Sequence, residues 1–212
     1  MRRLPLFPLP IVLFPGAPMP LHVFAPRYRQ MVAWCLEHDR RFGLIFHDPD
    51  RHGPFAMEQG RVGCMAEILK MQPLPDGRSL ILCRGESRFR VEDGIESGTA
   101  FYEALVEPFG DDADPGEYGM EERRRRSIDL FYRVLGEVVR YEGPYPSIDT
   151  DAESGFQIAQ AIRIDAAWQQ ELLEMRSERD RLDRLDELMR AVLSAEGDGG
   201  LDFGPSSDEP WN

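Results

Sequence analysis

Short apolar segments punctuated by proline and glycine dominate the first half of the chain. Residues 4–24 hold too many prolines for a helix but are dense in β-formers, and they predict two extended segments, around 9–13 and 19–24. Pro26 then suits the first turn of a helix, and apolar residues at helical spacing predict one amphipathic helix over 26–37. Further β-strands are predicted at residues 42–46, 62–71, 79–84, 88–92 and 101–106.

Two connections between these strands differ in composition. The run Leu74-Pro75-Asp76-Gly77-Arg78 predicts a tight hairpin turn, because its proline sets φ and its glycine accepts a positive φ. Residues 47–60, rich in Asp, Pro and Gly, predict a loop. The pattern therefore contains one clear antiparallel hairpin and one long connection.

Apolar residues recur at helical spacing in the second half of the chain. Asp, Gly and Pro crowd residues 110–119 and mark a domain boundary, after which a helix of about 20 residues is predicted. Shorter helices are predicted near 153–162 and 166–175, and a last helix begins at Ser177, with Asp180 completing a capping-box-like start.

The pattern predicts an α+β protein with a β-rich domain over 1–110, a helical bundle over 118–194 and a disordered acidic tail over 195–212.

In the helical part, Arg123 to Arg126 are flanked by acidic residues and are typical of a solvated helix start. Asp186 and Arg190 form an i,i+4 pair that is expected on the exposed face of the last helix.

Composition excludes several classes of function. The formal net charge of −13 would repel a polyanion, so nucleic acid is a poor partner. The single lysine, Lys70, follows no glycine-rich loop, which excludes a phosphate-loop ATPase and leaves Ser-Lys or Schiff-base chemistry no other lysine.

The remaining composition concerns the cellular compartment. Cys35, Cys64 and Cys83 are odd in number and form no C-x-x-C pair, so we expect reduced thiols and a cytoplasmic location. Prolines in the first 15 residues argue against a secretory signal, and no later apolar run approaches the length of a membrane span.

An ordered set of motifs runs along the chain: Leu4-Pro5-Leu6-Phe7-Pro8, Leu13-Phe14-Pro15-Gly16, Pro20-Leu21-His22-Val23-Phe24, Arg27-Tyr28, Arg41-Phe42-Gly43-Leu44-Ile45, Val62-Gly63-Cys64-Met65-Ala66-Glu67-Ile68, Leu74-Pro75-Asp76-Gly77-Arg78, Gly85-Glu86-Ser87-Arg88-Phe89-Arg90-Val91, Gln169 with Glu171-Leu172-Leu173-Glu174, and Arg181-Leu182. As a set, spanning residues 4–193, they resemble the N-terminal, substrate-recognition domain family of Lon-type proteases. One departure is Ala25, where the family often has Glu before Pro-Arg-Tyr. If that Glu pairs in the family with the arginine that matches Arg27, then Arg27 needs a different partner here.

The resemblance implies a PUA-like pseudo-barrel of mixed strands enclosing one helix, followed by a helical bundle. It also implies that the domain engages polypeptide segments, often unfolded or degron-bearing. In Lon the ATPase and Ser-Lys peptidase domains lie downstream. We therefore expect a stand-alone, non-enzymatic binding protein, acting as a recognition module, an adaptor or a chaperone-like accessory, with no cofactor.

Exposed apolar side chains on loops are the candidate contacts for a bound polypeptide. We expect them at one end of the sheet, and methionine suits varied partners because its side chain adapts its shape. The candidates are Phe46, Phe55, Met57, Met71 and Leu74.

Two alternatives stay open from the sequence. The first is a small-molecule- or RNA-binding pseudo-barrel, because the implied fold resembles RNA-binding barrels. The second is a hydrolase that holds a metal in the run His47-Asp48-Pro49-Asp50-Arg51-His52, although no other residues at metal-ligand spacing support it, and we predict no metal.

Overall fold

The computed structural model describes residues 1–112, 119–195 and 202–203. The chain folds as two compact units, Met1–Gly110 and Asp111–Asn212.

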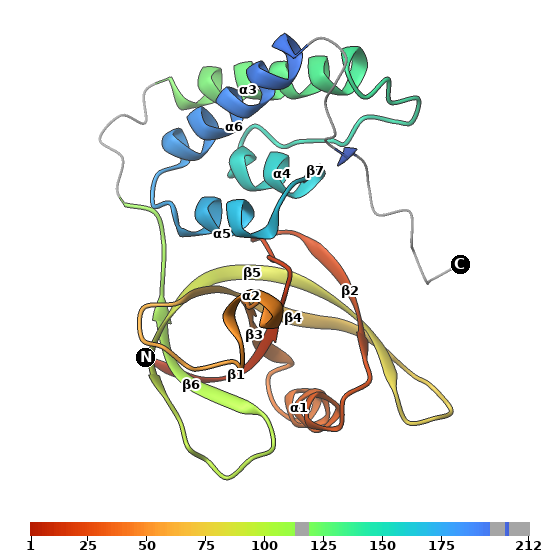
Figure 1. The fold of residues 1–212 in the computed structure, drawn as a ribbon, viewed down its shortest axis with the longest axis vertical. Helices are drawn as coiled ribbons and strands as arrows, with labels where there is room; N and C mark the ends of the chain where they lie inside the picture. The colour runs from red at the N-terminus through yellow and green to blue at the C-terminus, as the bar shows by residue number, and fades with distance from the viewer. Residues whose placement is uncertain (113–118, 196–201, 204–212) are drawn as a thin grey trace. The chain divides into compact units, whose positions relative to one another are not determined.

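Unit 1 is a mixed β-barrel. Its sheet has six strands in the order β2-β5-β4-β3-β1-β6, and a further pairing of β5 with β6 closes it (Figure 1). β1 runs parallel to β3, and the other described pairings are antiparallel. The strands are β1 Arg2–Leu9, β2 Pro18–Val23, β3 Arg41–Phe46, β4 Val62–Pro73, β5 Ser79–Gly94 and β6 Tyr102–Pro108.

Alternating apolar residues on these strands fill the barrel. One buried cluster comprises Leu4, Leu6, Ile45, Phe89, Val91, Ala104 and Val106. Two glycines make room for the ring of Phe89, since a Cβ added at Gly43 or at Gly63 would lie 2.6 Å from its Cζ. The interior of unit 1 is therefore filled by side chains that alternate along the strands, with Gly43 and Gly63 leaving space for Phe89.

Gly85 allows the backbone to approach closely where the segment before β2 crosses β5. Its N–H donates to the carbonyl of Ala17 (2.9 Å), and its own carbonyl accepts from Gly16 N–H (2.8 Å). A Cβ at position 85 would lie 2.2 Å from the carbonyl oxygen of Phe14. Only glycine fits there without moving the backbone.

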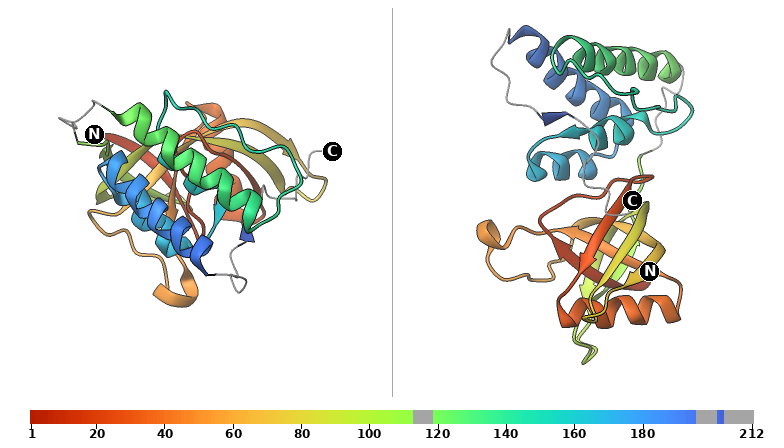
Figure 2. Two further views of the ribbon diagram at one scale, coloured as in Figure 1. Left: turned by 90° about the horizontal axis from the view of Figure 1, so that it is seen from above. Right: turned by 90° about the vertical axis from the view of Figure 1, so that its right-hand side faces the viewer.

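Helix α1 (Pro26–Glu37) matches its predicted bounds and lies across one end of the barrel (Figure 2). Pro26 occupies the first turn, and the face bearing Met31, Val32 and Cys35 is buried. The Arg27 side chain donates to the Tyr102 hydroxyl (3.0 Å).

Three of the predictions for unit 1 need correction. The first strand is β1 Arg2–Leu9 rather than 9–13, and it contains two prolines. β1 pairs with β6 only over Arg2–Leu6 and with β3 only over Leu6–Leu9. Pro5 and Pro8 are therefore each paired on one side only. On the open side no neighbouring strand needs a backbone N–H, and a strand tolerates proline at such a position.

The other corrections concern β5 and the loop after β3. The segments 79–84 and 88–92 form one continuous strand that passes through Gly85. The loop 47–60 contains a short helix, α2 (Pro49–His52), whose N-terminus is capped by the Asp48 side chain accepting from Asp50 N–H (3.0 Å).

Unit 2 is a helical bundle with one small β-pairing. Its helices are α3 Met120–Glu137, α4 Ser154–Ala161, α5 Ala166–Glu174 and α6 Glu178–Ser194. Ser177 caps α6 as predicted, accepting from Asp180 N–H (3.2 Å). In the predicted disordered tail, Asp202–Phe203 instead form strand β8, which pairs with β7 (Ile162–Arg163), and the rest of the tail beyond Ala195 lies outside the described residues.

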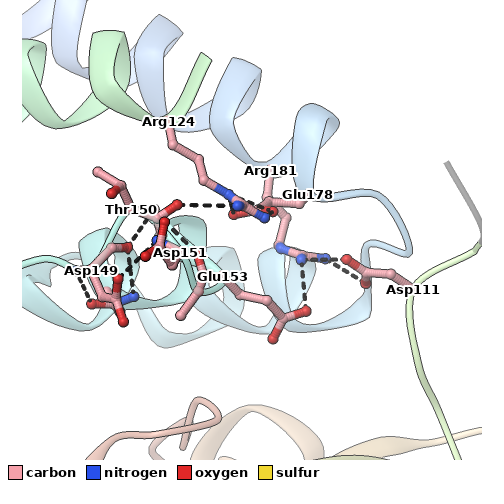
Figure 3. Close-up of polar contacts among 11 residues, drawn as sticks. Asp111, Arg124, Asp149, Thr150, Asp151, Glu153, Glu178 and Arg181 are labelled. Atoms are coloured by element: carbon pink, nitrogen blue, oxygen red, sulfur yellow. Dashed lines mark hydrogen bonds and ion pairs between the residues drawn. The ribbon is translucent and has the colours of Figure 1, made fainter. Parts of the chain in front are cut away.

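A fully buried arginine ties the start of unit 2 to α6. The Arg181 side chain, 0% exposed, forms a bidentate pair with Asp111 at 2.8 and 2.5 Å (Figure 3). It also donates to the Met175 carbonyl at 3.0 Å. Its guanidinium also lies 4.1 Å from the centre of the Phe156 ring and 3.5 Å from a carboxylate oxygen of Glu153. Arg181 thus joins three segments distant in sequence.

Two arginines at the start of α3 form contacts with α6, whereas the sequence predicts a solvated helix start. Arg124 pairs with Glu178 at 2.6 Å and donates to the Thr150 carbonyl, which joins α3 to α6 (Figure 3). Arg123 bridges to Asp186, whose side chain also accepts from Ser127 (2.7 Å).

Asp186 is therefore not on an exposed face. It is 2% exposed, although it does pair with Arg190 at 3.0 Å as predicted. The i,i+4 rule identifies the partner but cannot show that α3 covers the acid.

Candidate functional site

A groove in unit 1 lies between α1 and the hairpin formed by β4 and β5, and we call it the α1–hairpin groove. It has a volume of about 670 Å³. The lining residues are Pro26, Arg29, Gln30, Val32, Ala33, Leu36, Glu37, Met71, Pro73, Gly77, Arg78 and Ser79. The middle of the groove is apolar, with Arg29 and Arg78 toward one end and Glu37 toward the other.

Local folding explains why these residues meet. On α1 the spacing of Arg29, Ala33 and Leu36 places them on one stripe beside the buried face. On the hairpin, Met71 pairs with Ile81, which is 0% exposed, so Met71 lies on the inner face of the sheet. Met71 itself is 41% exposed, because α1 leaves the far end of the hairpin uncovered.

Charge at the two ends of the groove is unequal. Near the hairpin turn, Arg78 pairs with Asp76 at 2.5 Å, and the hydrogen bond from Arg78 lowers the pKa of the Asp76 carboxyl. Arg29 lies against Gly77, where an added Cβ would be 2.5 Å from its Nη2. Among the described residues, the Arg29 side chain forms no ion pair or hydrogen bond, whereas Glu37 brings a carboxylate to the other end.

The structure separates the five predicted contact residues into two regions. Met71 lines the groove, and Leu74 is half-buried in the adjacent turn. Met57 instead lies against Gly94, at the opposite end of β5. The five residues therefore lie in two regions, whereas we expected all of them at one end of the sheet.

Phe55 and Met57 pack against the buried cluster of the barrel. The Phe55 ring contacts Tyr102 edge-on with ring centres 4.8 Å apart. Phe46, at the end of β3, is half-buried with its ring 6.1 Å from that of His52. These side chains seal the loop onto the barrel and offer less free surface than Met71 does.

Sequence reasoning missed the helix side of the groove. Arg29, Ala33 and Leu36 are not among the predicted contacts. The available signal was the small residue Ala33 on the outward face of an otherwise charged helix surface. Its meaning depends on the hairpin about 40 residues later, which the spacing within α1 cannot reveal.

The His47–His52 loop does not assemble a metal site. His47 is buried and its Nε2 lies 2.9 Å from the Gly53 carbonyl oxygen, a hydrogen bond within the loop. Across the described parts of the chain, no group of three or more His, Cys, Asp or Glu side chains is arranged to hold a metal ion.

The three cysteines are buried free thiols. Burial raises the pKa of Cys35 to about 12 and that of Cys83 to about 12, and it also raises the pKa of Cys64. A thiol of such high pKa is not a nucleophile at neutral pH.

Comparison with known proteins identifies the family. The model of the ATP-dependent protease La (LON) substrate-binding domain matches residues 3–191. The chain belongs to this Lon substrate-binding domain family. The Lon protease of Xanthomonas oryzae pv. oryzae is 29% identical over 190 residues, which cover 86% of this chain and 22% of that protein.

Solved structures of Lon N-terminal domains share the fold. A Lon N-terminal domain protein from Xanthomonas campestris superimposes with a TM-score of 0.60 at 26% identity, covering 87% of this chain and 97% of that one. The N-terminal domain of the Mycobacterium avium complex Lon protease gives a TM-score of 0.65 at 16% identity, covering 89% and 98%. These matches confirm the predicted α+β fold.

The matched region is the substrate-binding domain, and the chain does not cover the protease domain of these relatives. It spans a quarter or less of the length of the curated Lon proteases that it matches. In the described residues, no helix combines the length and apolar character needed to cross a membrane.

Proposed function

We propose that this chain binds segments of other polypeptides and that the α1–hairpin groove is the contact surface. The observation that carries the proposal is an open groove with an apolar middle, formed by Ala33, Leu36 and Met71, in a domain of the Lon substrate-binding family. Exposed apolar surface of this kind marks protein-interaction sites.

The dimensions of the groove suit an extended segment. Helix α1 has 12 residues and is therefore about 18 Å long. An extended chain advances about 3.3 Å per residue, so roughly five residues would lie along the helix. A segment of that length presents two or three side chains to the groove, because alternate side chains point to the same side.

Strand addition at the edge of the sheet is a less favourable mode of binding. β2 pairs only with β5 among the described strands, so its other side is an edge. The Gly85 N–H donates to the Ala17 carbonyl, so the backbone groups of Ala17 face β5. By alternation, the backbone groups at positions 18, 20 and 22 of β2 face the open edge. Two of those are Pro18 and Pro20, which have no N–H to offer, and proline on an edge strand discourages added strands.

The bound polypeptides would be unfolded or degron-bearing segments, as substrates of a protease that acts with this domain or as clients of an adaptor. The proposed location is the cytoplasm, which the three unpaired thiols favour. The roles of relatives as proteases support a link to proteolysis and name no particular substrate.

Two substitutions in the groove test the proposal. Met71→Glu and Ala33→Glu each place a carboxylate in its apolar middle, and both positions are exposed, so the fold should tolerate the change. We expect each to weaken binding of a labelled unfolded polypeptide about tenfold or more, measured by fluorescence anisotropy, because the charge must be desolvated against apolar surface.

Leu69→Glu is the matched control. Leu69 lies on the same strand and is 39% exposed, but it does not line the groove. The Leu69 variant should bind as the wild type does. Equal affinity of all three variants and the wild type would contradict the groove as the contact surface. If the wild type binds no unfolded polypeptide, the proposed function itself is wrong.

A further inference from the structure

Charge is distributed very unevenly along the chain. Residues 1–110 contain 13 Lys or Arg and 13 Asp or Glu, so unit 1 is electrically balanced. The formal charge of −13 therefore belongs entirely to residues 111–212. A ligand approaching the groove meets local charges in a neutral unit, and the character of its rim decides which ligand is favoured.

Many cations of unit 1 are already neutralised by a neighbouring carboxylate. Such pairs are Arg2–Asp39, Arg3–Glu103, Arg41–Glu86, Arg78–Asp76 and Arg84–Glu67. Arg29 differs because its guanidinium has no ion-pair or hydrogen-bond partner among the described residues, although Arg29 lines the groove. Its guanidinium is positioned by packing against Gly77 and keeps its N–H donors available.

We propose that the α1–hairpin groove selects extended segments in which an acidic side chain lies next to apolar residues. The carboxylate pairs with Arg29, and the apolar side chains lie over Ala33, Leu36 and Met71. This inference rests on the proposed function and adds the class of segment that is bound.

The groove favours an internal acidic residue over a free C-terminal carboxylate. Pro26 also lines the groove, almost one helical turn beyond Arg29. A segment whose carboxylate reaches Arg29 therefore has further groove to occupy, whereas a chain terminus would leave that part empty.

The opposite end of the groove makes the selection directional. Glu37 lies eight residues after Arg29 on α1, about 12 Å along the helix axis. A carboxylate at that end of the segment would meet the Glu37 carboxylate and be repelled. The acidic residue is thus expected at one end of the apolar stretch and not at the other.

The test uses one set of labelled peptides and four forms of the full chain. The peptides share an apolar stretch and differ in one flanking residue, Asp, Asn or Lys, with amidated C-termini, and a fourth carries Asn with a free C-terminal carboxylate directly after the apolar stretch. The proteins are the wild type, Arg29→Gln, Met71→Glu and Arg84→Gln. The last is the matched control, because Arg84 is an exposed arginine of unit 1 outside the groove.

We expect the wild type to bind the Asp peptide about three- to tenfold more tightly than the Asn peptide, with the Lys peptide weakest, in the range of one charge-assisted contact. Arg29→Gln should remove the preference while binding of the Asn peptide stays unchanged. Arg84→Gln should keep the preference. The Asp preference of the wild type should shrink as salt is added.

Three results would overturn the inference. They are no Asp preference in the wild type, a preference that survives Arg29→Gln, and a preference for the free C-terminus that exceeds that for the internal Asp. In each case the proposed function would still stand if the wild type binds the Asn peptide and Met71→Glu abolishes that binding. Absence of binding for every peptide would instead contradict the proposed function as well.

Discussion

Replacement of Arg181 should destabilise unit 2 selectively. The side chain is 0% exposed and makes its bidentate pair with Asp111, and it also covers the Phe156 ring. Arg181→Met keeps most of the apolar volume but removes the cation that faces a largely desolvated carboxylate. The loss is therefore mainly electrostatic rather than a loss of packing.

The magnitude follows from the burial of the two partners. Removing one partner of a fully buried pair costs about 3–5 kcal/mol. Asp111 is 22% exposed, so water recovers part of its solvation, and we expect about 2–4 kcal/mol for Arg181→Met. Arg181→Lys keeps the charge but loses the planar fork, and we expect about half of that cost.

Hydrogen exchange measured by mass spectrometry on the full chain resolves the effect by unit. Protection of amides in α6 that exchange through unfolding of unit 2 should fall by a factor of about 30 to 1000, while β4 should keep its protection. Arg125→Met is the control, because Arg125 is exposed and, among the described residues, its side chain pairs only with Glu121 on the same helix. A loss below about 0.5 kcal/mol for Arg181→Met, or equal losses for Met and Lys, would refute the electrostatic reasoning.

Three further predictions concern unit 1. Gly85→Ala should cost about 3 kcal/mol in urea unfolding, because its Cβ would meet backbone, whereas Gly110→Ala, with nothing within 4 Å, should be near neutral. Burial alone would raise the pKa of Glu103, but hydrogen bonds from its neighbours outweigh burial and the pKa is lowered. Its stabilising contribution is therefore complete above its unfolded pKa of roughly 4.3 and is lost as the pH falls through the lower folded value, so Glu103→Gln should flatten the acid limb of stability against pH. An aromatic disulfide reagent at pH 8 should label Cys35 and Cys83 only slowly in the native protein and rapidly in urea, and fast native labelling would contradict their burial and raised pKa values.

Local signals account for the parts of the fold that sequence reasoning predicted well. The bounds of α1, the cap at Ser177 and the hairpin turn at Gly77 each depend on residues close together in the chain. Gly77 has φ of 79°, the left-handed conformation that the Pro-Asp-Gly turn implied. Such features need no knowledge of tertiary structure.

Other parts could not be predicted because they depend on pairing between distant segments. The strand around Pro5 and Pro8 exists because β6 and β3 each pair with only one half of it. Asp186 is buried because α3 covers it. The groove likewise exists only where α1 faces the far end of the hairpin, so neither element alone indicates it.

The groove as the contact surface is the central claim, and methyl NMR of the methionines tests it most directly. The chain has nine methionines, and two of them, Met71 in the groove and Met57 packed on the barrel, separate the two regions of predicted contacts. On titration with an unfolded polypeptide, the Met71 methyl signal should shift or broaden while the Met57 signal stays in place. Perturbation of Met57 with an unchanged Met71 signal would contradict the account.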